Sequence, residues 1–301
     1  MKQLVILSGK GGTGKTSLSA AFAHLASEGP DSLRAVLADA DVDAANLELV
    51  LHPERLETHD FTGGSVAVID PQRCRACGVC EQACRFGAIL PISLAKPGAG
   101  YMVNPLACEG CAACVYQCPE GAIEMQPQVA GQWHRSQSRY GPLFHAELFP
   151  AQENSGKLVT LVKQNARLCA LDGGFEALLV DGPPGIGCPV IAAAAGAHLA
   201  LIVTEPTAAG IHDLQRVLQT TAHFRVPTRV AINKADLYPD GVDQINALCD
   251  TINVSIAGQI PFDPAVGMAM MNGEPVTAYR PDAPASQAIR SVWQGLVGEL
   301  R

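Results

Sequence analysis

Short apolar runs alternate with helix-forming stretches through most of the chain. The first runs are KQLVILSG at 2–9 and AVLADADVDAANL at 35–47, separated by the helical stretch TSLSAAFAHLASEG. After residue 176 the alternation resumes with ALLVDGPPG, LALIVTEP and TRVAINKADL, and helical stretches such as HDLQRVLQTTAHF lie between them. Strands that alternate with helices predict a doubly wound, mostly parallel α/β sheet. In such sheets, ligands bind at the carboxyl ends of the strands.

A cysteine-rich segment interrupts this alternation and contains an internal repeat. The stretch DPQRCRACGVCEQACRFGAI at 70–89 recurs as NPLACEGCAACVYQCPEGAI at 104–123, offset by 34 residues throughout. All four cysteines match, and so do the preceding proline and the following Gly-Ala-Ile. Helical repeats can have a similar period, but dense cysteines flanked by Gly and Pro do not suit stacked helix pairs. We therefore predict an α+β insert at 62–127 within an α/β domain formed by 1–61 and 128–301.

Composition and charge narrow the class of protein. The 301 residues suffice for one large domain or two unequal ones, and 48% hydrophobic with 17% charged residues is ordinary for a globular protein. The formal charge of −8, with no basic run, argues against nucleic-acid binding. No charged-then-apolar leader opens the sequence, so we expect a cytoplasmic protein. In that reducing setting, its 11 cysteines favour metal ligation over disulfides.

Stable membrane insertion is not expected. The longest apolar stretch, VIAAAAGAHLALIV at 190–203, is too short to cross a bilayer and contains His198. The C-terminal stretch SQAIRSVWQGLVGELR has an apolar stripe and only two arginines. Such a stripe is more typical of core packing than of a membrane anchor.

The stretch GKGGTGKT at 9–16 follows a predicted strand and precedes a predicted helix. In that context a Gly-x4-Gly-Lys-Thr pattern binds nucleotide phosphates. Its glycines let backbone N–H groups approach phosphate oxygens, and the helix N-terminus favours anions. Lys15 would contact the β and γ phosphates, and the Thr16 hydroxyl would bind Mg²⁺. The predicted nucleotide contacts along the loop are Gly9, Lys10, Gly11, Gly12, Thr13, Gly14, Lys15, Thr16 and Ser17.

Lys10 makes this loop similar to the deviant Walker A loop of the MinD/ParA family, which includes the nitrogenase iron protein and the Mrp-type cluster carriers. The resemblance implies a homodimer with nucleotide at the interface, in which Lys10 contacts phosphates bound by the other copy. In DADVD, it implies that Asp39 supports Mg²⁺ and that Asp41 orients the attacking water. Catalysis would then depend on Lys10, Lys15, Asp39 and Asp41.

Two further motifs are similar to the same family. Asp181 opens DGPPGIG and resembles the Walker B and switch II aspartate, which converts the state of the γ phosphate into a conformational change. Asn233 opens NKAD, which resembles both the guanine-binding NKxD of GTPases and the adenine-contacting asparagine of MinD-like proteins. Because the phosphate loop and DADVD are of the MinD type, we favour ATP over GTP.

The two cysteine runs share the spacing Cys-x2-Cys-x2-Cys-x3-Cys, which resembles that of bacterial two-cluster ferredoxins. In that family each run gives three thiolates to one [4Fe–4S] cluster and its fourth thiolate to the other. The resemblance assigns one cluster to Cys74, Cys77, Cys80 and Cys118, and the second to Cys108, Cys111, Cys114 and Cys84. Paired Cys-x2-Cys units also suit zinc, but four cysteines in each of two repeated runs favour clusters.

Two residues outside these motifs have alternative interpretations. Cys188 follows Asp181 at the offset where the nitrogenase iron protein has a cluster ligand. It is either a redox- or metal-responsive thiol or a buried cysteine that opens a helix. His145 is either a ligand or cluster neighbour or, as we favour, a packed histidine.

Nearly the whole chain is similar to MinD-superfamily P-loop ATPases with an inserted ferredoxin-like domain. The resemblance implies an Mg²⁺-dependent ATPase whose nucleotide state gates electron transfer from two [4Fe–4S] clusters to an unidentified redox or metallocluster protein. One alternative is a metallocluster assembly or carrier ATPase, and another is a MinD-like spatial organiser. Mrp-like carriers use a C-terminal Cys-x2-Cys, whereas this chain has only Cys249 after residue 200.

Overall fold

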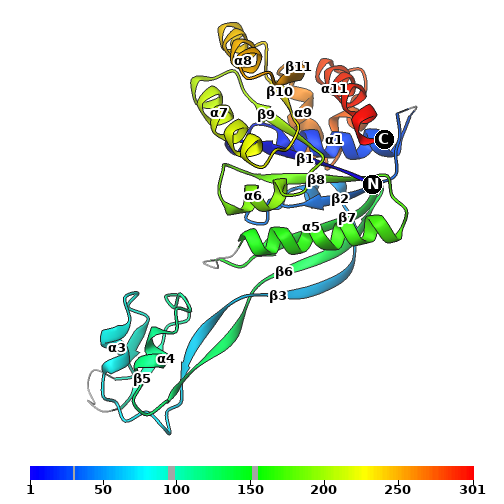
Figure 1. Ribbon diagram of the computed structural model, residues 1–301. Coiled ribbons are helices and arrows are strands. Elements are labelled where there is room, and N and C mark those ends of the chain that lie inside the picture. The colour runs from blue at the N-terminus through cyan, green and yellow to red at the C-terminus, as the bar shows by residue number, and fades with distance from the viewer. Residues whose placement is uncertain (30, 94–98, 151–154) are drawn as a thin grey trace. The chain divides into compact units, whose positions relative to one another are not determined.

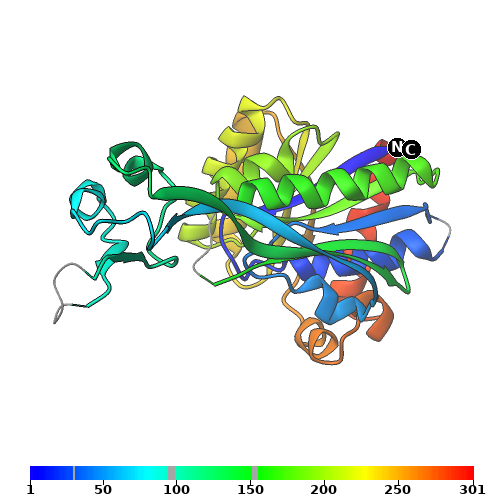
Figure 2. The ribbon, with the colours of Figure 1, turned by 90° about the horizontal axis from the view of Figure 1, so that it is seen from below.

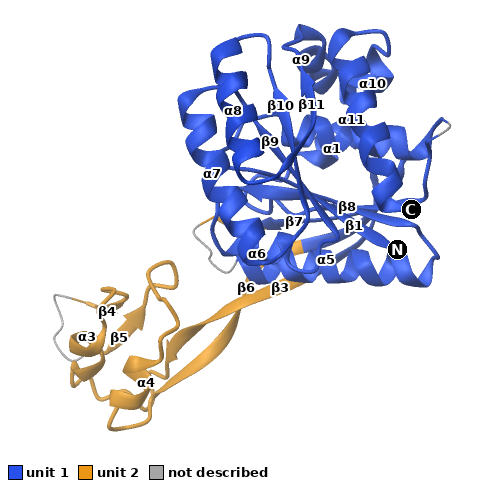
Figure 3. Cartoon of the chain, turned by 45° about the horizontal axis from the view of Figure 1, so that its top comes forward, with its two compact units in different colours: residues 1–59, 133–147, 155–301 blue, residues 60–132, 148–154 orange. Residues whose placement is uncertain are grey.

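The structure is a computed structural model that describes residues 1–29, 31–93, 99–150 and 155–301. Residues 94–98 of the predicted insert lie outside this description. The chain divides into two compact units, which Figure 3 colours separately. Unit 1 comprises Met1–His59, Trp133–Glu147 and Ser155–Arg301, and unit 2 comprises Asp60–Gln132 and Leu148–Asn154. Unit 2 is therefore inserted between segments of unit 1.

The main sheet has nine strands in the order β11-β10-β9-β1-β8-β2-β7-β6-β3. From β11 to β7 each neighbouring pair is parallel, which confirms the predicted mostly parallel α/β sheet. Strand β1 is buried after its first residue, because its apolar run is covered on both faces. These seven strands are β1 (Lys2–Ser8), β2 (Ala35–Asp39), β7 (Gly141–Leu148), β8 (Ala177–Pro184), β9 (Leu199–Thr204), β10 (Thr228–Asn233) and β11 (Ser255–Ile260).

Helices cover both faces of this sheet in unit 1 (Figures 1 and 2). One layer contains α1 (Lys15–Ser27), α2 (Leu47–Leu51), α9 (Pro264–Met271), α10 (Val276–Tyr279) and α11 (Pro284–Leu300). The other layer contains α5 (Ser155–Asp172), α6 (Cys188–Ala194), α7 (Ala208–His223) and α8 (Pro239–Thr251). In the first layer the rings of Phe22 and Trp293 lie 5.1 Å apart between their centroids. The C-terminal stripe of α11 is buried in this core, as the sequence predicted.

The sequence predicted the second strand but not two long ones. The run at 35–47 was expected to contain a strand with acidic residues at its end, and β2 ends at Asp39, while Leu47 begins α2. The sequence did not indicate the long strands β3 (Glu54–Ile69) and β6 (Ile123–Ser138), which have 16 residues each and belong partly to each unit. The first seven residues of β3 are exposed and mostly polar, so they lack the alternation that marks a half-buried strand.

Unit 2 holds the two cysteine runs on very short elements. The helices α3 (Val79–Ala83) and α4 (Ala113–Gln117) have five residues each. The strands β4 (Ile89–Pro91) and β5 (Tyr101–Val103) form an antiparallel pair. Among the described residues the buried core cluster of this unit is Ala67, Cys80, Ile89, Cys114 and Ile123. Two cysteines are thus core residues of unit 2.

Candidate functional site

The predicted phosphate loop connects β1 to α1, and two of its glycines are closely approached by other residues. A Cβ on Gly9 would lie 2.3 Å from Cβ of Asp213, and a Cβ on Gly14 would lie 2.4 Å from Nδ2 of Asn233. Gly14 also has φ 95°, a left-handed conformation that favours glycine. Thr13 Oγ1 is buried without a hydrogen-bond partner in the described chain. Backbone and side chain at this loop are therefore arranged for a ligand with acceptor atoms.

Two buried carboxylates lie next to each other, one at the carboxyl end of β2 and one in the second half of β8. Asp39 and Asp181 are register partners across these strands and are 0% and 1% exposed. The Asp39 carboxylate accepts hydrogen bonds from the backbone N–H of Asp41 at 3.1 Å and of Leu47 at 3.0 Å. Oδ1 of Asp181 accepts a bond from the Ser19 hydroxyl at 2.9 Å. The strands thus bring together two acids that lie far apart in the sequence.

The electrostatics of this pair fit a bound Mg²⁺. Burial raises the pKa of Asp39 well above its usual range, and the neighbouring Asp181 charge raises it further. Burial also raises the pKa of Asp181, opposed by Lys15 and by hydrogen bonds from the Thr16 and Ser19 hydroxyls. Oδ2 of Asp181 is buried and has no partner among the described residues. Mg²⁺ prefers oxygen ligands, and Oδ2 of Asp181 is a carboxylate oxygen without a hydrogen-bond partner in the described chain.

The two lysines of the loop have different carboxylate neighbours. Nζ of Lys15, a residue only 6% exposed, lies 3.6 Å from Oδ2 of Asp41. Nζ of Lys10 is more exposed and lies 3.1 Å from Oε2 of Glu205, which also pairs with Lys234 at 2.5 Å. Lys15 therefore faces the inner part of the site, and Lys10 lies at its more open side.

Asn233 and Asp236, at the end of β10, both bond to backbone groups. Nδ2 of Asn233 donates to the carbonyl oxygen of Thr13 at 2.7 Å, which ties β10 to the phosphate loop. Oδ1 of Asp236 accepts a bond from the N–H of Phe262 at 2.6 Å. One oxygen of the carboxylate that would recognise guanine is therefore already engaged.

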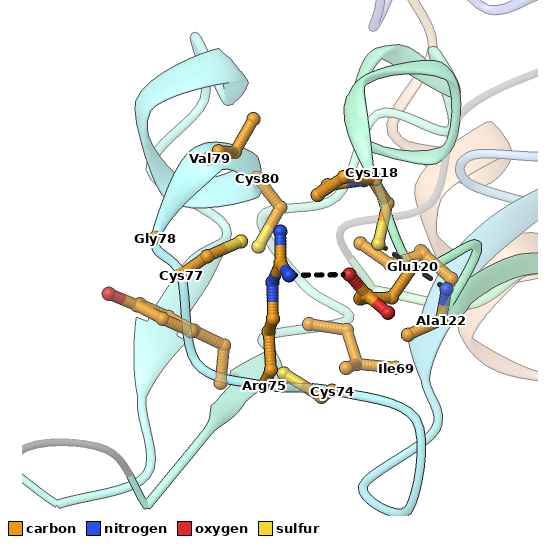
Figure 4. A pocket seen from close by; sticks show the side chains of 13 residues that line it. Ile69, Cys74, Arg75, Cys77, Gly78, Val79, Cys80, Cys118, Glu120 and Ala122 are labelled. Atoms are coloured by element: carbon orange, nitrogen blue, oxygen red, sulfur yellow. Dashed lines mark hydrogen bonds and ion pairs between the residues drawn. The ribbon is translucent and has the colours of Figure 1, made fainter.

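The eight predicted cluster cysteines surround two cavities in unit 2. Cys74, Cys77, Cys80 and Cys118 line one cavity, and Figure 4 shows these side chains around it. A second cavity is lined by Cys84, Cys108, Cys111 and Cys114. Each cavity has three cysteines of one run and the fourth of the other, which is the grouping implied by the ferredoxin resemblance.

The loops around the two cavities have matching backbone features, which fit a bound cluster. Residues Ala76 and Gly78 of the first run, like Gly110 and Ala112 of the second, all have φ between 58° and 78°. A Cβ on Gly110 would lie 2.5 Å from the carbonyl oxygen of Ser65, so this position requires glycine. The N–H groups of Ala88 and Ala122 donate to Sγ of Cys84 and Cys118, each at 3.3 Å. Such bonds to sulfur stabilise negative charge on a thiolate.

No single-ion site accompanies these cavities in the described ranges. Among residues 1–29, 31–93, 99–150 and 155–301, no three His, Cys, Asp or Glu side chains converge closely enough to hold one metal ion. Burial raises the pKa of the Cys80 and Cys114 thiols. A thiolate at either position therefore needs positive charge nearby, which bound iron would supply.

Comparison with known proteins identifies the family. Residues 4–276 match the model of the CobQ/CobB/MinD/ParA nucleotide binding domain. The chain belongs to this family. An uncharacterized protein of Methanocaldococcus jannaschii is 32% identical over 261 residues, covering 87% of this chain and 84% of that protein. An iron-sulfur cluster carrier protein of Aquifex aeolicus is 26% identical over 132 residues, covering 40% of this chain and 36% of that protein.

Solved structures of the family have the same fold. The septum site-determining protein MinD of Pyrococcus horikoshii, complexed with Mg-ADP, has a TM-score of 0.58 and 18% identity and covers 97% of this chain and 94% of its own. A ParA family ATPase of Chlorobium tepidum has a TM-score of 0.56 and 16% identity and covers 98% of both chains. In the part of the chain that the structure describes, no helix is long and apolar enough to cross a membrane.

Some residues of the site were not recognised in the sequence. Ser19 and Glu205 have no motif of their own, although Glu205 directly follows β9 at the ligand-binding edge of the sheet. The backbone N–H of Leu47 also has no sequence signal, because only the folded chain brings it to Asp39. Glu205 could have been predicted from its position, because it is a polar residue directly after a buried strand.

The structure shows the surroundings of both residues with alternative interpretations. Cys188 is exposed at the start of α6, so it is not the buried cysteine of the second interpretation. His145 is 2% exposed, forms a hydrogen bond with the Ser136 hydroxyl at 2.9 Å and lies 3.2 Å from Glu48, as expected of a packed histidine.

Proposed function

We propose that this chain is an ATP-binding and ATP-hydrolysing iron–sulfur protein in which the nucleotide state gates electron transfer from two [4Fe–4S] clusters to a partner protein. The observation that carries the proposal is the pair of cavities, each lined by four cysteines, in a chain of a nucleotide-binding family. The partial similarity to an iron-sulfur cluster carrier protein also supports iron–sulfur chemistry.

In this proposal the residues of the nucleotide site divide the work of hydrolysis. Lys15 and the N–H groups of the loop hold the phosphates, and Thr16 and Asp39 support Mg²⁺ and its waters. Asp41, 3.6 Å from the Lys15 ammonium, orients the attacking water. Asp181 opens the switch II segment, which responds to the γ phosphate.

Dimerisation is a further part of the proposal. Lys10 leaves Glu205 and contacts the phosphates bound by a second copy of the chain, where its charge offsets the negative charge of the transition state. The Lys10 side chain is 34% exposed, and Glu205, which is 11% exposed, keeps its ion pair with Lys234 when Lys10 leaves.

The cysteines would hold the clusters in the same two groups of four that line the cavities. A bound [4Fe–4S] cluster supplies one-electron redox chemistry. The N–H groups of Ala88 and Ala122 donate to the sulfurs of Cys84 and Cys118, one at each cavity, and so stabilise negative charge there. The apolar neighbours Ile69, Ile123 and Val103 limit the access of water to the cavities.

We assign adenine rather than guanine to the base site. Asp236 already accepts the Phe262 N–H, and Asn233 is tied to the phosphate loop through Thr13. A comparison of ATP and GTP hydrolysis rates under the same conditions tests this assignment. A strong preference for GTP contradicts it.

Anaerobic purification followed by iron and sulfide counts tests the cluster content. The gating step is then tested by the rate at which the reduced protein transfers electrons to a dye, with MgATP, with MgADP and without nucleotide. We expect about eight irons per chain and an electron-transfer rate that depends on the nucleotide. Lys15→Gln is the matched control, because it weakens phosphate binding without touching a cysteine. A rate that is the same in all three nucleotide states overturns gating.

A metallocluster carrier is the second candidate, and the partial similarity to the Aquifex aeolicus carrier protein and to a cytosolic Fe-S cluster assembly factor of Eremothecium gossypii favours it. These matches cover 40% of this chain in each case. A carrier releases iron and sulfide to an apo-protein in a nucleotide-dependent way, whereas an electron carrier keeps them. ATP-dependent binding to liposomes would instead favour a MinD-like spatial organiser.

A further inference from the structure

Helix α2 connects the nucleotide site of unit 1 to the strands that lead into unit 2. Its first residue, Leu47, donates its backbone N–H to Oδ2 of Asp39 at 3.0 Å. The next residue, Glu48, contacts two other elements through Oε2. It lies 3.2 Å from Nδ1 of His145 on β7 and 3.4 Å from Nη2 of Arg55 on β3. Adjacent residues of one short helix thus contact the predicted Mg²⁺ ligand and two strands.

The buried ring of His145 lies between α2 and β6. Burial lowers the pKa of His145 to about 3, so the ring is neutral near pH 7. Nδ1 lies 3.2 Å from Oε2 of Glu48, and Nε2 forms a hydrogen bond with the Ser136 hydroxyl on β6 at 2.9 Å. One ring therefore contacts α2 on one side and β6 on the other.

A second link joins the same strands beside the first. The rings of His134 on β6 and His145 on β7 have centroids 5.0 Å apart. Nδ1 of His134 lies 3.0 Å from the Thr58 hydroxyl on β3. His134 and His145 are 1% and 2% exposed, whereas Glu48 and Arg55 are partly open to solvent. Polar contacts therefore connect α2, β3, β6 and β7, and those between the two histidine rings are buried.

Strands β3 and β6 extend from these polar contacts into unit 2. Both strands leave unit 1 at residues 59 and 133 and continue into the unit that contains the cysteines. Any change in the hydrogen bonds of Asp39 on nucleotide binding acts on the first turn of α2, because Leu47 N–H is one of its two backbone donors. Glu48 transmits a displacement of that turn to β3 and β7.

We propose that Glu48 is a positioning residue that couples the Asp39 carboxylate to strands β3 and β6, so that nucleotide binding changes the stability of these strands. The coupling gives the proposed gating a physical route, and to that extent it rests on the proposed function. It is nevertheless measurable without any electron transfer, because its direct effect is on the backbone hydrogen bonds of the two strands.

Hydrogen–deuterium exchange of the full, cluster-loaded chain tests this, with and without a non-hydrolysable ATP analogue and Mg²⁺. In the wild type we expect exchange in 54–69 and 123–138 to change by about fivefold or more when the analogue binds. Glu48→Ala should reduce that ratio to about one while the analogue still binds. Glu57→Ala is the matched control, because it breaks an exposed ion pair between β3 and β6, at 2.7 Å to Arg135, and touches no residue of α2.

Further variants separate coupling from simple damage to α2. Glu48→Gln keeps a polar side chain of nearly the same size and shape beside His145, so it should restore most of the nucleotide response that Glu48→Ala loses. His145→Gln changes the same contact at the residue on β7 and should reduce the nucleotide response as much as Glu48→Ala does. The double variant Glu48→Ala with His145→Gln should lose no more of the nucleotide response than either single variant, because the two residues act through one contact.

The outcomes separate this inference from the proposed function. An unaltered nucleotide response in Glu48→Ala, or no response of these strands in the wild type, overturns the coupling. A response of the strands with nucleotide-independent electron transfer supports the coupling and contradicts the proposed gating. A loss that Glu57→Ala reproduces also overturns it, since the effect then follows from weakening the strand pair in general.

Discussion

The nucleotide site of unit 1 and the cysteine cavities of unit 2 are stabilised in different ways. Asp39 and Asp181 lie on neighbouring strands of a large sheet, where Ser19 and Leu47 hold them by hydrogen bonds. In unit 2, two of the five residues in the described core cluster are the cysteines Cys80 and Cys114. The residues that hold the nucleotide site in place are thus not the ones that bind the ligand alone, since the sheet supports them. In unit 2, by contrast, cysteines that would bind the clusters also form part of the core.

This difference predicts different responses to loss of the bound groups. Helices α3 and α4 have five residues each, far fewer than an isolated helix needs to be stable. Where a metal site is not formed in the unfolded chain, the free energy of metal binding contributes directly to folding. We therefore expect unit 2 to depend on its clusters and unit 1 to fold without them. Both tryptophans, Trp133 and Trp293, belong to unit 1, so their fluorescence reports on unit 1.

The largest expected effect comes from removing cysteines in pairs. Cys84 and Cys108 line the same cavity, so Cys84→Ala with Cys108→Ala should lose one cluster and keep about four irons per chain. Cys84 and Cys74 belong to one run but line different cavities, so Cys84→Ala with Cys74→Ala should lose nearly all iron. Iron and sulfide counts after anaerobic purification distinguish the two results.

The half-buried Cys169, which lines neither cavity, provides the control for these pairs. Cys169→Ala should keep all the iron. In every variant the tryptophan-monitored unfolding midpoint should stay close to that of the wild type. Equal iron in the two double variants would contradict the grouping by cavity, and a large shift of the midpoint would contradict the independence of unit 1.

The second effect tests whether unit 2 keeps its iron when the nucleotide site of unit 1 is damaged. Lys15→Gln removes the ammonium that faces the inner nucleotide site, and the loss of one such charge stabilising a transition state costs about 10²- to 10³-fold in rate. We expect ATP hydrolysis to fall by that factor while the iron content stays unchanged. Steady-state phosphate release and iron counts on one preparation provide the measurement. Loss of iron in this variant would show that the two sites depend on each other for stability.

The third effect concerns acid, which should weaken unit 1 through buried histidine. The pKa of His145 falls from 6.5 to about 3 on burial, so the unfolded chain binds its proton at a higher pH than the folded chain does. Stability is therefore full above pH 6.5 and falls as the pH drops. At pH 5 the cost is about 2 kcal/mol, from roughly 1.5 pH units at about 1.4 kcal/mol each.

Urea unfolding followed by tryptophan fluorescence measures this cost at pH 7 and at pH 5. The free energy of unfolding should fall by about 2 kcal/mol more in the wild type than in His145→Gln, whose side chain does not titrate. The variant starts from a lower stability at pH 7, because it alters the contacts to Glu48 and Ser136. Equal losses in the two proteins would assign the acid sensitivity to other groups.

The sequence predicted those parts of the molecule that depend on local pattern. The alternation of apolar runs and helices predicted the sheet, and the loop between β1 and α1 predicted the position of the nucleotide site. Asp39 and Asp181 can each be named from a motif, whereas the pairing of β2 with β8 that brings them together appears only in the structure.

The parts that escaped prediction depend on contacts between distant segments. Strand β3 is exposed along its first seven residues, so its apolar and polar residues do not alternate. The bond from Leu47 to Asp39 uses a backbone N–H, which no side chain marks. The contacts of Glu48 with His145 and Arg55 join α2 to two strands, and nothing in their local sequence indicates a partner.

The two halves of unit 2 are also unequal, in spite of the repeat. Arg75 and Glu109 occupy equivalent positions, 34 residues apart, and so do Phe86 and Glu120. The first cavity is lined by Arg75 and Glu120, which pair at 2.9 Å, and the second by Glu109 and Phe86. Figure 4 shows the Arg75–Glu120 pair beside the first cavity. The side chains around the second cavity therefore carry the more negative charge.

The smallest expected effect follows from this inequality. Negative charge near a cluster disfavours its reduction, so the cluster held by Cys108, Cys111, Cys114 and Cys84 should have the lower reduction potential. Arg75→Gln removes one exposed positive charge and should lower the potential of the other cluster by roughly 30 mV, about a threefold change for a one-electron couple. Glu109→Gln should raise the lower potential by a similar amount, and redox titration at low salt measures both. Because both side chains are exposed, both shifts should shrink at high salt, and shifts that resist salt would indicate a change of loop structure instead of charge.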